Sequence, residues 1–394
     1  MDFTHCVGID CGTSSIKIVV RDLEFDEVSP VTYADGRAVT IPSFVSVTED
    51  RKIIIAPSER HRAVRQWRFD NLKGKILFQQ EFASQVLADL PMICQVEGRE
   101  LPDPKWALNL SYPQPHYELM LALKLSYLMR RVRDDFNLGI GCPLWSLPLP
   151  VTSVNSNEAL AMRRAYSLAL EYSHSEHTSE PYYDLAEYNR LFAEFKKNRS
   201  NDGHTEPEGL QVMPEGVCNI IAIASASFRN TDRFSLLDIG AATIELVTFS
   251  LEGQQLDIYH SKTCPLGIES LKSKELISFL PEGDIDIDSG ATGQISNEII
   301  GSLISPSKLN SQYYKNKALV ELFMCGGGSL VRPLAEIPKG IPESRLIPFG
   351  VPPIATQQAL AGSAGYESIS ADILPRYLVA CGLSVPAVNF STYR

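Results

Sequence analysis

Two segments far apart in the chain repeat one pattern, and this repeat restricts the fold more than any other feature. Residues 6–20 read CVGIDCGTSSIKIVV, and residues 234–249 read FSLLDIGAATIELVTF. In each segment two apolar, β-prone runs flank a turn of small residues, which is typical of a β-hairpin. The first run ends near an aspartate in both segments, Asp10 and Asp238. The repeat predicts an internal duplication of two hairpins, each with a carboxylate beside its turn.

A third turn of small residues follows an apolar run near the end of the chain. Residues 319–325 are strand-like, three glycines follow at 326–328, and a helix-prone stretch begins after them. Where a strand passes through a glycine turn into the start of a helix, free backbone N–H groups point outward and bind anions. The segment therefore predicts a turn that holds a nucleotide or another anion.

Strand-like and helix-like patterns alternate between these landmarks, which predicts an α/β protein. Apolar spacing predicts helices over residues 117–133 and 156–172 and a strand over 144–153. Residues 174–209 are polar and rich in Glu, Ser and Asn, and they contain one short amphipathic helix with Phe192 and Phe195 on its apolar face. We interpret this stretch as an insertion whose helix buries both phenylalanines.

Length, charge and cysteine usage exclude several classes of protein. The 394 residues suffice for two or three domains or one large body with two halves. A net charge of −11 argues against a dedicated nucleic-acid binder and against a protein held on anionic lipid. No run approaches the ~18 apolar residues that span a bilayer, no secretory signature opens the chain, and the eight cysteines form no CxxC pair. We expect a soluble, cytoplasmic protein with no membrane partner.

Phosphate chemistry gives the hairpins a role. A nucleoside triphosphate brings about four negative charges, which Mg²⁺ and backbone amides must neutralise. The chain has no GxxxxGK[ST] loop, and no GxGxxG follows the first strand. Two hairpins facing each other across a cleft would hold a phosphate chain from both sides, with Asp10 and Asp238 reaching Mg²⁺ mainly through water.

The three motifs, in this order, resemble those of the actin/heat-shock-chaperone/sugar-kinase ATPase superfamily, and most closely the nucleotide-binding domain of heat-shock chaperones. Residues 8–15 resemble the first phosphate loop, residues 237–243 with Glu245 the second, and residues 326–329 with Arg332 the adenosine loop. The resemblance implies an α/β, actin-like two-lobed ATPase fold of duplicated ribonuclease-H-like domains, each with an inserted subdomain. We expect no substrate-binding domain.

The resemblance also implies where the lobes divide. The first lobe would comprise residues 1–215, with a small subdomain at about 36–98 and the polar insertion at about 174–209. The second lobe would comprise residues 216–394, with a small subdomain at about 263–316.

The resemblance further implies the site residues. The catalytic residues would be Asp10, Lys73, Glu215 and Asp238, and the two aspartates would also bind Mg²⁺. The nucleotide would contact Gly12, Thr13, Ser14, Lys17, Gly240, Ala241, Ala242, Thr243, Gly326, Gly327, Gly328, Ser329 and Arg332. Lys17 matches a lysine that actins place on the terminal phosphates, and Lys73 resembles the chaperone lysine that orients the attacking water. Because residues 60–75 are strongly basic, a solvated charged face is the other interpretation of Lys73.

One departure from the family pattern affects turnover. The second loop usually carries Gly-Gly after Asp-x-Gly, whereas this chain has Ala241 and Ala242. Each methyl group restricts positive φ and close backbone approach to phosphate. We therefore expect binding of ATP or ADP with Mg²⁺ and slow basal hydrolysis.

The resulting hypothesis is a chaperone-like nucleotide switch in which lobe closure controls a protein partner that the sequence does not identify. A filament-forming actin-like ATPase, which self-assembles, is the first alternative and is favoured by Lys17. A small-molecule kinase is the second, suggested by GIDCGTSS at residues 8–15.

Overall fold

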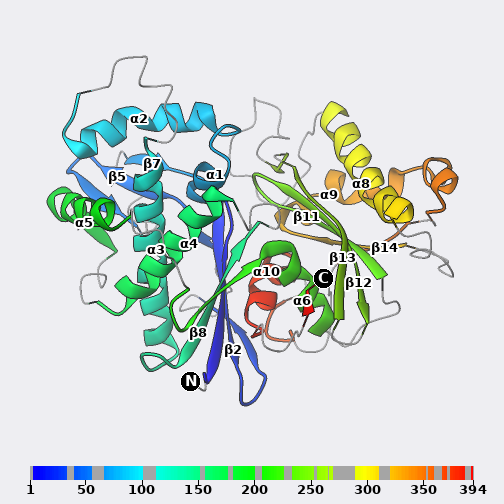
Figure 1. The fold of residues 1–394 in the computed structure, drawn as a ribbon, viewed down its shortest axis with the longest axis horizontal. Helices are drawn as coiled ribbons and strands as arrows, with labels where there is room; N and C mark the ends of the chain where they lie inside the picture. The colour runs from blue at the N-terminus through cyan, green and yellow to red at the C-terminus, as the bar shows by residue number, and fades with distance from the viewer. Residues whose placement is uncertain are drawn as a thin grey trace.

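The computed structural model describes most of the chain. The described residues are 3–32, 40–55, 66–100, 112–150, 156–175, 181–199, 206–225, 233–252, 255–264, 266–268, 289–309, 320–351, 354–358, 366–370, 373–386 and 392–393. They form a mixed α/β structure with two large sheets and one small sheet, so the predicted α/β class is confirmed (Figure 1).

The first large sheet contains the first predicted hairpin. Its strand order is β10-β8-β1-β2-β3, with β4 also paired to β2. The strands are β1 (His5–Cys11), β2 (Ser15–Asp22), β3 (Val28–Pro30), β4 (Ile41–Pro42), β8 (Pro143–Leu149) and β10 (Leu210–Pro214). Strands β1, β2 and β3 run antiparallel in turn, whereas β8 is parallel to both β1 and β10. The predicted strand over 144–153 is thus confirmed as far as residue 149, and residues 151–155 lie outside the described part.

The second large sheet repeats this arrangement around the second predicted hairpin. Its order is β15-β14-β11-β12-β13-β16. The strands are β11 (Arg233–Ile239), β12 (Ile244–Glu252), β13 (Gln255–Cys264), β14 (Val320–Cys325), β15 (Ile354–Gln358) and β16 (Thr392–Tyr393). Strand for strand, β13-β12-β11-β14-β15 has the same order and the same directions as β3-β2-β1-β8-β10. Both predicted hairpins are confirmed, and the duplication extends to the strands beside them.

A small antiparallel sheet of order β7-β5-β6-β9 lies beside the first large sheet. Its strands are β5 (Val45–Thr48), β6 (Lys52–Ile54), β7 (Gln66–Phe69) and β9 (Tyr182–Asp184), and the helices near it are α1 (Leu72–Leu77), α2 (Ala83–Glu97) and α5 (Leu185–Asn198). Strand β9 and helix α5 come from the stretch interpreted as an insertion. Strand β9 pairs with β6, so residues 182–184 of that stretch form an edge of the small sheet. Phe192 and Phe195 are buried, as predicted.

Helices α3 (Gln114–Asp135) and α4 (Asn157–Ser173) pack against each other next to the first large sheet (Figure 1). Both predicted helices are confirmed within a few residues. Ser156 caps α4, because its side chain accepts a hydrogen bond from the Ala159 backbone N–H.

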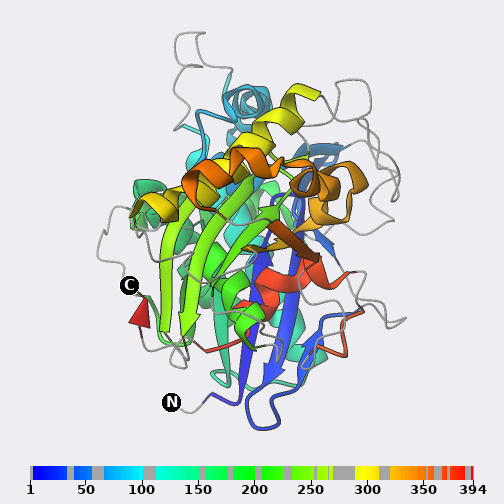
Figure 2. The ribbon, with the colours of Figure 1, turned by 90° about the vertical axis from the view of Figure 1, so that its right-hand side faces the viewer.

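Two helices lie between the large sheets, α6 (Glu215–Ser225) and α10 (Leu374–Leu383) (Figures 1 and 2). They cross at close range: a Cβ added at Gly382 would lie 1.7 Å from the Cys218 carbonyl oxygen, so only glycine fits there. One hydrophobic core includes Val19 of the first sheet, Leu236 of the second, and residues of both helices. The two halves of the molecule therefore share a core around α6 and α10.

Helix α8 (Ser289–Leu309) covers the second sheet (Figure 2). After β14 the predicted helix is confirmed, but only as the short α9 (Arg332–Glu336), with a 3-10 turn before it and three further 3-10 turns after it. Pro333 lies in the first turn of α9, where proline is tolerated, whereas Pro338 follows the helix and limits its length. Of the predicted subdomain at 263–316, residues 265, 269–288 and 310–316 lie outside the described part of the chain.

All eight cysteine thiols are unpaired, and seven of them are buried, as expected for small apolar side chains. No helix in the described part of the chain is both long and apolar enough to cross a membrane.

Candidate functional site

The first hairpin joins two of the predicted site residues. In the β1–β2 ladder Asp10 lies opposite Lys17, and the Lys17 Nζ donates to Asp10 Oδ2 at 2.8 Å. Asp10 is only 3% exposed, and its Oδ1 is buried with no hydrogen-bond partner among the described residues. Since buried carboxylate oxygens ordinarily have partners, Oδ1 is an acceptor that remains available to a ligand.

The second hairpin places Asp238 at the equivalent position of β11, opposite Glu245. The side-chain amide of Asn219, on α6, donates to Asp238 Oδ2 at 2.8 Å. Burial, together with the nearby Glu215 and Asp10 carboxylates, raises the pKa of Asp238 to about 6, although the Asn219 hydrogen bond opposes the shift. Asp238 is thus a buried carboxylate close to other carboxylates, a combination that occurs at functional sites more often than elsewhere.

Lys73 and Glu215 form a second ion pair. Lys73 lies in the first turn of α1, where Asn71 caps the helix, and Glu215 is the first residue of α6. The Lys73 Nζ lies 2.6 Å from Glu215 Oε2. Burial alone would lower the pKa of Lys73, but the carboxylates of Glu215 and Asp10 outweigh it and raise the pKa above its usual value. Lys73 therefore carries a buried positive charge, and its interpretation as part of a solvated face is wrong.

Lys75, in the same basic stretch, is also buried, and its Nζ lies 2.5 Å from Asp89 Oδ2. Lys73 and Lys75 look solvated in the sequence because their acidic partners, Glu215 and Asp89, lie elsewhere in the chain.

Helix α6 connects the two halves of the site. Glu215 and Asn219 are one turn apart, so they lie on the same face of the helix. Glu215 reaches Lys73 on α1, and Asn219 reaches Asp238 on β11. The structure thus brings together Asp10, Lys17, Lys73, Glu215 and Asp238. Asn219 was not predicted as a site residue, although it is the one amide in the otherwise apolar run of residues 217–224.

The first turn requires glycine at Gly12. A Cβ added there would lie 2.6 Å from the Ser15 carbonyl oxygen and 2.9 Å from the Lys17 Nζ. Ser43 fixes the turn from outside, because its hydroxyl donates to the Thr13 carbonyl. Thr13 is half-buried and Ser14 is exposed at the tip.

The second turn, with its two alanines, is closed by backbone hydrogen bonds. The Gly240 N–H donates to the Thr243 carbonyl at 2.8 Å. Two further bonds tie the turn to residues 267–268, which donate to the carbonyls of Ala242 and Gly240, each at 3.0 Å. Neither Ala241 nor Ala242 is among the described residues with positive φ. The alanines therefore fit this conformation of the turn without strain.

The third turn packs directly against the second hairpin. Gly326 has φ of +77°, and a Cβ added there would lie 2.3 Å from Asp238 Oδ1. A Cβ at Gly328 would lie 2.2 Å from the Ile239 side chain. Both glycines are therefore required by close contact with β11, a reason that is independent of any ligand.

Two other predicted residues of this turn differ in their surroundings. Ser329 is fully buried, and its hydroxyl donates to the Gly326 carbonyl at 2.8 Å, so it stabilises the turn. A Cβ added at Gly327 would meet its nearest neighbour, the Ile268 side chain, only at 4.0 Å, which leaves the backbone of Gly327 accessible. Nothing is described for the side chain of Arg332.

Buried thiols surround the carboxylates. Cys11 follows Asp10, Cys218 lies on α6, and Cys325 ends β14 beside Asp238. Burial raises the pKa of the Cys11 thiol to about 12 and that of Cys218 and Cys325 well above the usual value. These thiols stay protonated at neutral pH, which disfavours thiolate nucleophiles or ligands here.

The donor set suits Mg²⁺ bound through water. Among the described residues no three Asp, Glu, His or Cys side chains gather closely enough to hold a metal ion directly. Mg²⁺ prefers oxygen ligands, keeps several of its waters, and commonly uses one or two carboxylates together with substrate phosphates. The unpartnered Oδ1 of Asp10 and the carboxylate of Asp238 fit that requirement.

A scan against protein-family models gives no match to this chain, and a search of curated proteins gives none either. Function is therefore inferred from the geometry of these side chains.

Proposed function

We propose that the protein binds Mg²⁺-ATP between two lobes of an actin-like fold, hydrolyses it slowly, and uses lobe closure to control a protein partner. The repeated strand order supports this proposal, since each large sheet presents a hairpin with an aspartate beside its turn. The core shared through α6 and α10 supports a connection that transmits movement between the halves.

The observation that carries the proposal is a set of three polar contacts, two of which α6 makes. Lys17 pairs with Asp10, Lys73 with Glu215, and the amide of Asn219 with Asp238. Three carboxylates and two ammonium groups from separate elements meet at the junction of the two halves. Charged groups are costly to bury even when they are paired, and clusters of buried charged groups occur at functional sites more often than elsewhere.

Each residue has a role in phosphoryl transfer to water. Bound Mg²⁺ would neutralise charge on the phosphates. Lys17 would place its ammonium group on the terminal phosphates, and Lys73 with Glu215 would orient the attacking water. Asp10 and Asp238 would accept hydrogen bonds from water around the metal. Catalysis of this reaction consists mainly of positioning and charge neutralisation.

The same contacts suggest how the nucleotide would act as a signal. A phosphate chain between the hairpins would compete with Asp10 for Lys17 and with Glu215 for Lys73. Since Glu215 and Asn219 share one face of α6, a change in either partner would act on this helix and on the close crossing with α10 at Gly382. Nucleotide state would thereby bias the angle between the halves.

Calorimetry on the folded chain tests the proposal. We expect ATP to bind more tightly with Mg²⁺ than without it, and Asp10→Asn and Asp238→Asn each to reduce the Mg²⁺-dependent part. Asn189→Ala is the control, because this amide on α5 donates to the Val96 carbonyl away from the site. A folded wild-type protein that gives no heat with adenine nucleotides would rule the proposal out.

Two further measurements separate the alternatives. Sedimentation of the ATP-bound protein as a polymer would favour the filament-forming ATPase. Formation of ADP only after addition of a sugar or acid acceptor would favour the kinase.

A further inference from the structure

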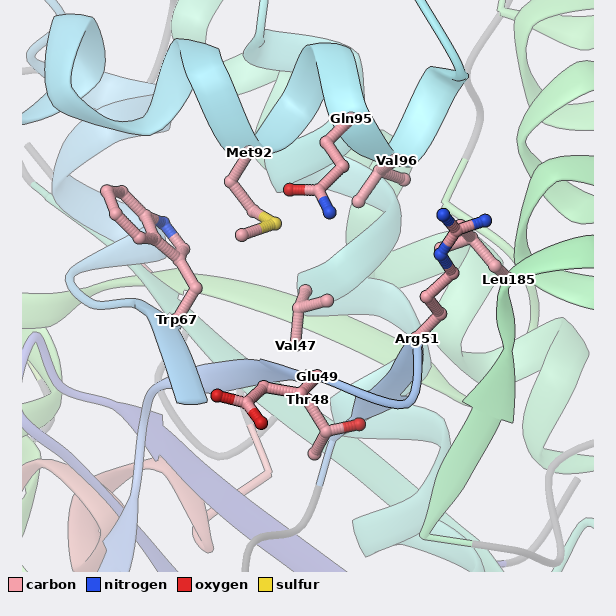
Figure 3. A pocket seen from close by; sticks show the side chains of 9 residues that line it. All are labelled: Val47, Thr48, Glu49, Arg51, Trp67, Met92, Gln95, Val96 and Leu185. Carbon is pink, nitrogen blue, oxygen red and sulfur yellow. The ribbon is translucent and has the colours of Figure 1, made fainter. Parts of the chain in front are cut away.

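A separate cavity of about 520 Å³ lies beside the small sheet, on residues that the proposed nucleotide site does not use (Figure 3). The β5–β6 turn and β7 form one side of it, and α2 with the start of α5 forms the other. Its volume is in the range of sites for small organic ligands. The lining residues are Val47, Thr48, Glu49, Arg51, Trp67, Met92, Gln95, Val96 and Leu185.

The cavity has an apolar floor and a polar rim. Val47 and Val96 are buried, and Trp67, Met92 and Leu185 are half-buried against the same core. The rim residues are exposed, namely Glu49, Arg51 and Gln95. An apolar hollow rimmed by polar groups is typical of a surface that binds a partner.

Two polar groups of the cavity lack partners in the described part of the chain. The Trp67 Nε1–H is buried and has no hydrogen-bond acceptor, although a buried indole N–H usually finds one. Arg51, in the β5–β6 turn, has φ of +63°, a backbone conformation that glycine adopts more readily. The guanidinium group forms no ion pair among the described residues. Arg51 thus presents an exposed positive charge at the edge of the cavity.

The two charges of the rim lie apart. In Figure 3 the Glu49 carboxylate is on the side of Trp67, whereas the Arg51 guanidinium is on the side of Leu185, with Val47 between them. The Gln95 amide points toward the space above Val47. A ligand that spans the floor therefore meets an anion at one end, a cation at the other, and amide and indole donors between them.

We propose that this cavity binds a short apolar peptide with free termini. Its amine would pair with Glu49, its carboxylate with Arg51, and its apolar side chains would cover Val47, Met92 and Val96. Peptide carbonyl groups would accept from the Trp67 indole and the Gln95 amide. A fatty acid or a nucleotide is disfavoured, because its only charge is negative. Glu49 would then have no cation to pair with and would face either a negative charge or an apolar chain. The proposal is independent of nucleotide binding.

Calorimetry on the full chain with the tripeptide Leu-Ala-Leu tests it. We expect a dissociation constant of about 1 mM or tighter. C-terminal amidation and N-acetylation should each weaken binding about fivefold, because each removes one exposed ion pair. Arg51→Gly should weaken binding of the free peptide to the same extent and abolish the effect of amidation. Trp67→Phe keeps an aromatic ring but removes the indole N–H, and it should also weaken binding.

Arg51→Gly should not impair folding, because glycine adopts the positive φ of this position more readily than arginine. The midpoint temperature of thermal unfolding should therefore stay the same or rise. Asn137→Gly is the matched control, since Asn137 also has positive φ but lies outside the cavity. Absence of binding to the wild type, or equal binding to wild type and Arg51→Gly, would overturn the proposal. Insensitivity to N-acetylation would also overturn it, in favour of a simple apolar carboxylate.

Discussion

Lys73 and Glu215 are 142 positions apart in the chain, yet their side chains meet at 2.6 Å. Lys73 comes from α1, next to the small sheet, and Glu215 begins α6, which lies between the large sheets. The pair therefore ties the small sheet to the helix on which both halves of the molecule pack. Only 9% of the Lys73 side chain and 20% of the Glu215 side chain are exposed, so solvent screens the pair little.

Removal of one partner should destabilise the fold. Lys73→Met leaves the Glu215 carboxylate half-buried without its counterion, and we expect the free energy of unfolding to fall by about 3 kcal/mol. Urea denaturation of wild type, Lys73→Met, Glu215→Gln and the double variant measures this. The double variant should be at least ~1 kcal/mol more stable than the sum of the single effects predicts. Strict additivity would show that the two side chains do not interact in solution.

Asn219 should affect metal-dependent binding specifically. If the proposed function holds, Asn219→Ala releases the Asp238 carboxylate from its orientation, and we expect Mg²⁺-ATP to bind about tenfold more weakly, equivalent to one lost hydrogen bond to a charged group. Adenosine binding should not change, because adenosine carries no phosphate and recruits no metal. Calorimetry with both ligands makes the comparison, with Asn189→Ala as the control for loss of a side-chain amide. An equal loss for both ligands would assign Asn219 a purely structural role.

The sequence predicted the features of the fold that depend on residues near one another in the chain. Alternating apolar runs around small residues predicted both hairpins, and once a hairpin forms, its register alone brings Lys17 opposite Asp10. The helix cap at Ser156 and the apolar face of α5 were likewise predicted, because each depends on residues only a few positions apart.

Contacts between residues far apart in the chain could not be predicted from the sequence. The sequence suggested that Lys73 is solvated because Glu215 is remote in the chain. The pairing of β9 with β6 was not predicted, because it joins residues about 130 positions apart. Gly326 suggested an anion-binding turn, yet its contact with Asp238 already requires glycine. The helix expected after this turn is present but short, because α9 ends at Glu336, just before Pro338.

The alanine turn should limit turnover in this conformation. Ala241 and Ala242 adopt unstrained backbone and are held by bonds from residues 267–268. If γ-phosphate closure needs positive φ, glycine would permit it and alanine would oppose it. We expect Ala241→Gly/Ala242→Gly to raise the single-turnover rate of ATP hydrolysis with little change in affinity, at a cost in stability of about 1 kcal/mol. Rapid turnover by the wild type, or an unchanged rate in the variant, contradicts this expectation.

Lys124 should make stability depend on pH. It is fully buried on α3, and its Nζ donates to the carbonyls of Phe44, at 3.1 Å, and Ile55, at 2.6 Å, which flank β5 and β6. A neutral amine has the two donors that these acceptors need. Burial lowers the pKa of Lys124 to about 7, far below the value of ~10.4 for an unfolded chain.

Between these two pKa values the unfolded state binds more protons than the folded state, so stability should rise with pH above 7. From pH 7 to 8.5 we expect the free energy of unfolding of the wild type to increase by about 1.5 kcal/mol relative to Lys124→Met. Urea denaturation at several pH values in this window, below the range where buried thiols titrate, gives the comparison. Because other titrating groups are common to both proteins, their contributions cancel in the difference. Parallel pH profiles for the two proteins would mean that Lys124 stays charged in the folded state, with both carbonyls bound to an ammonium group.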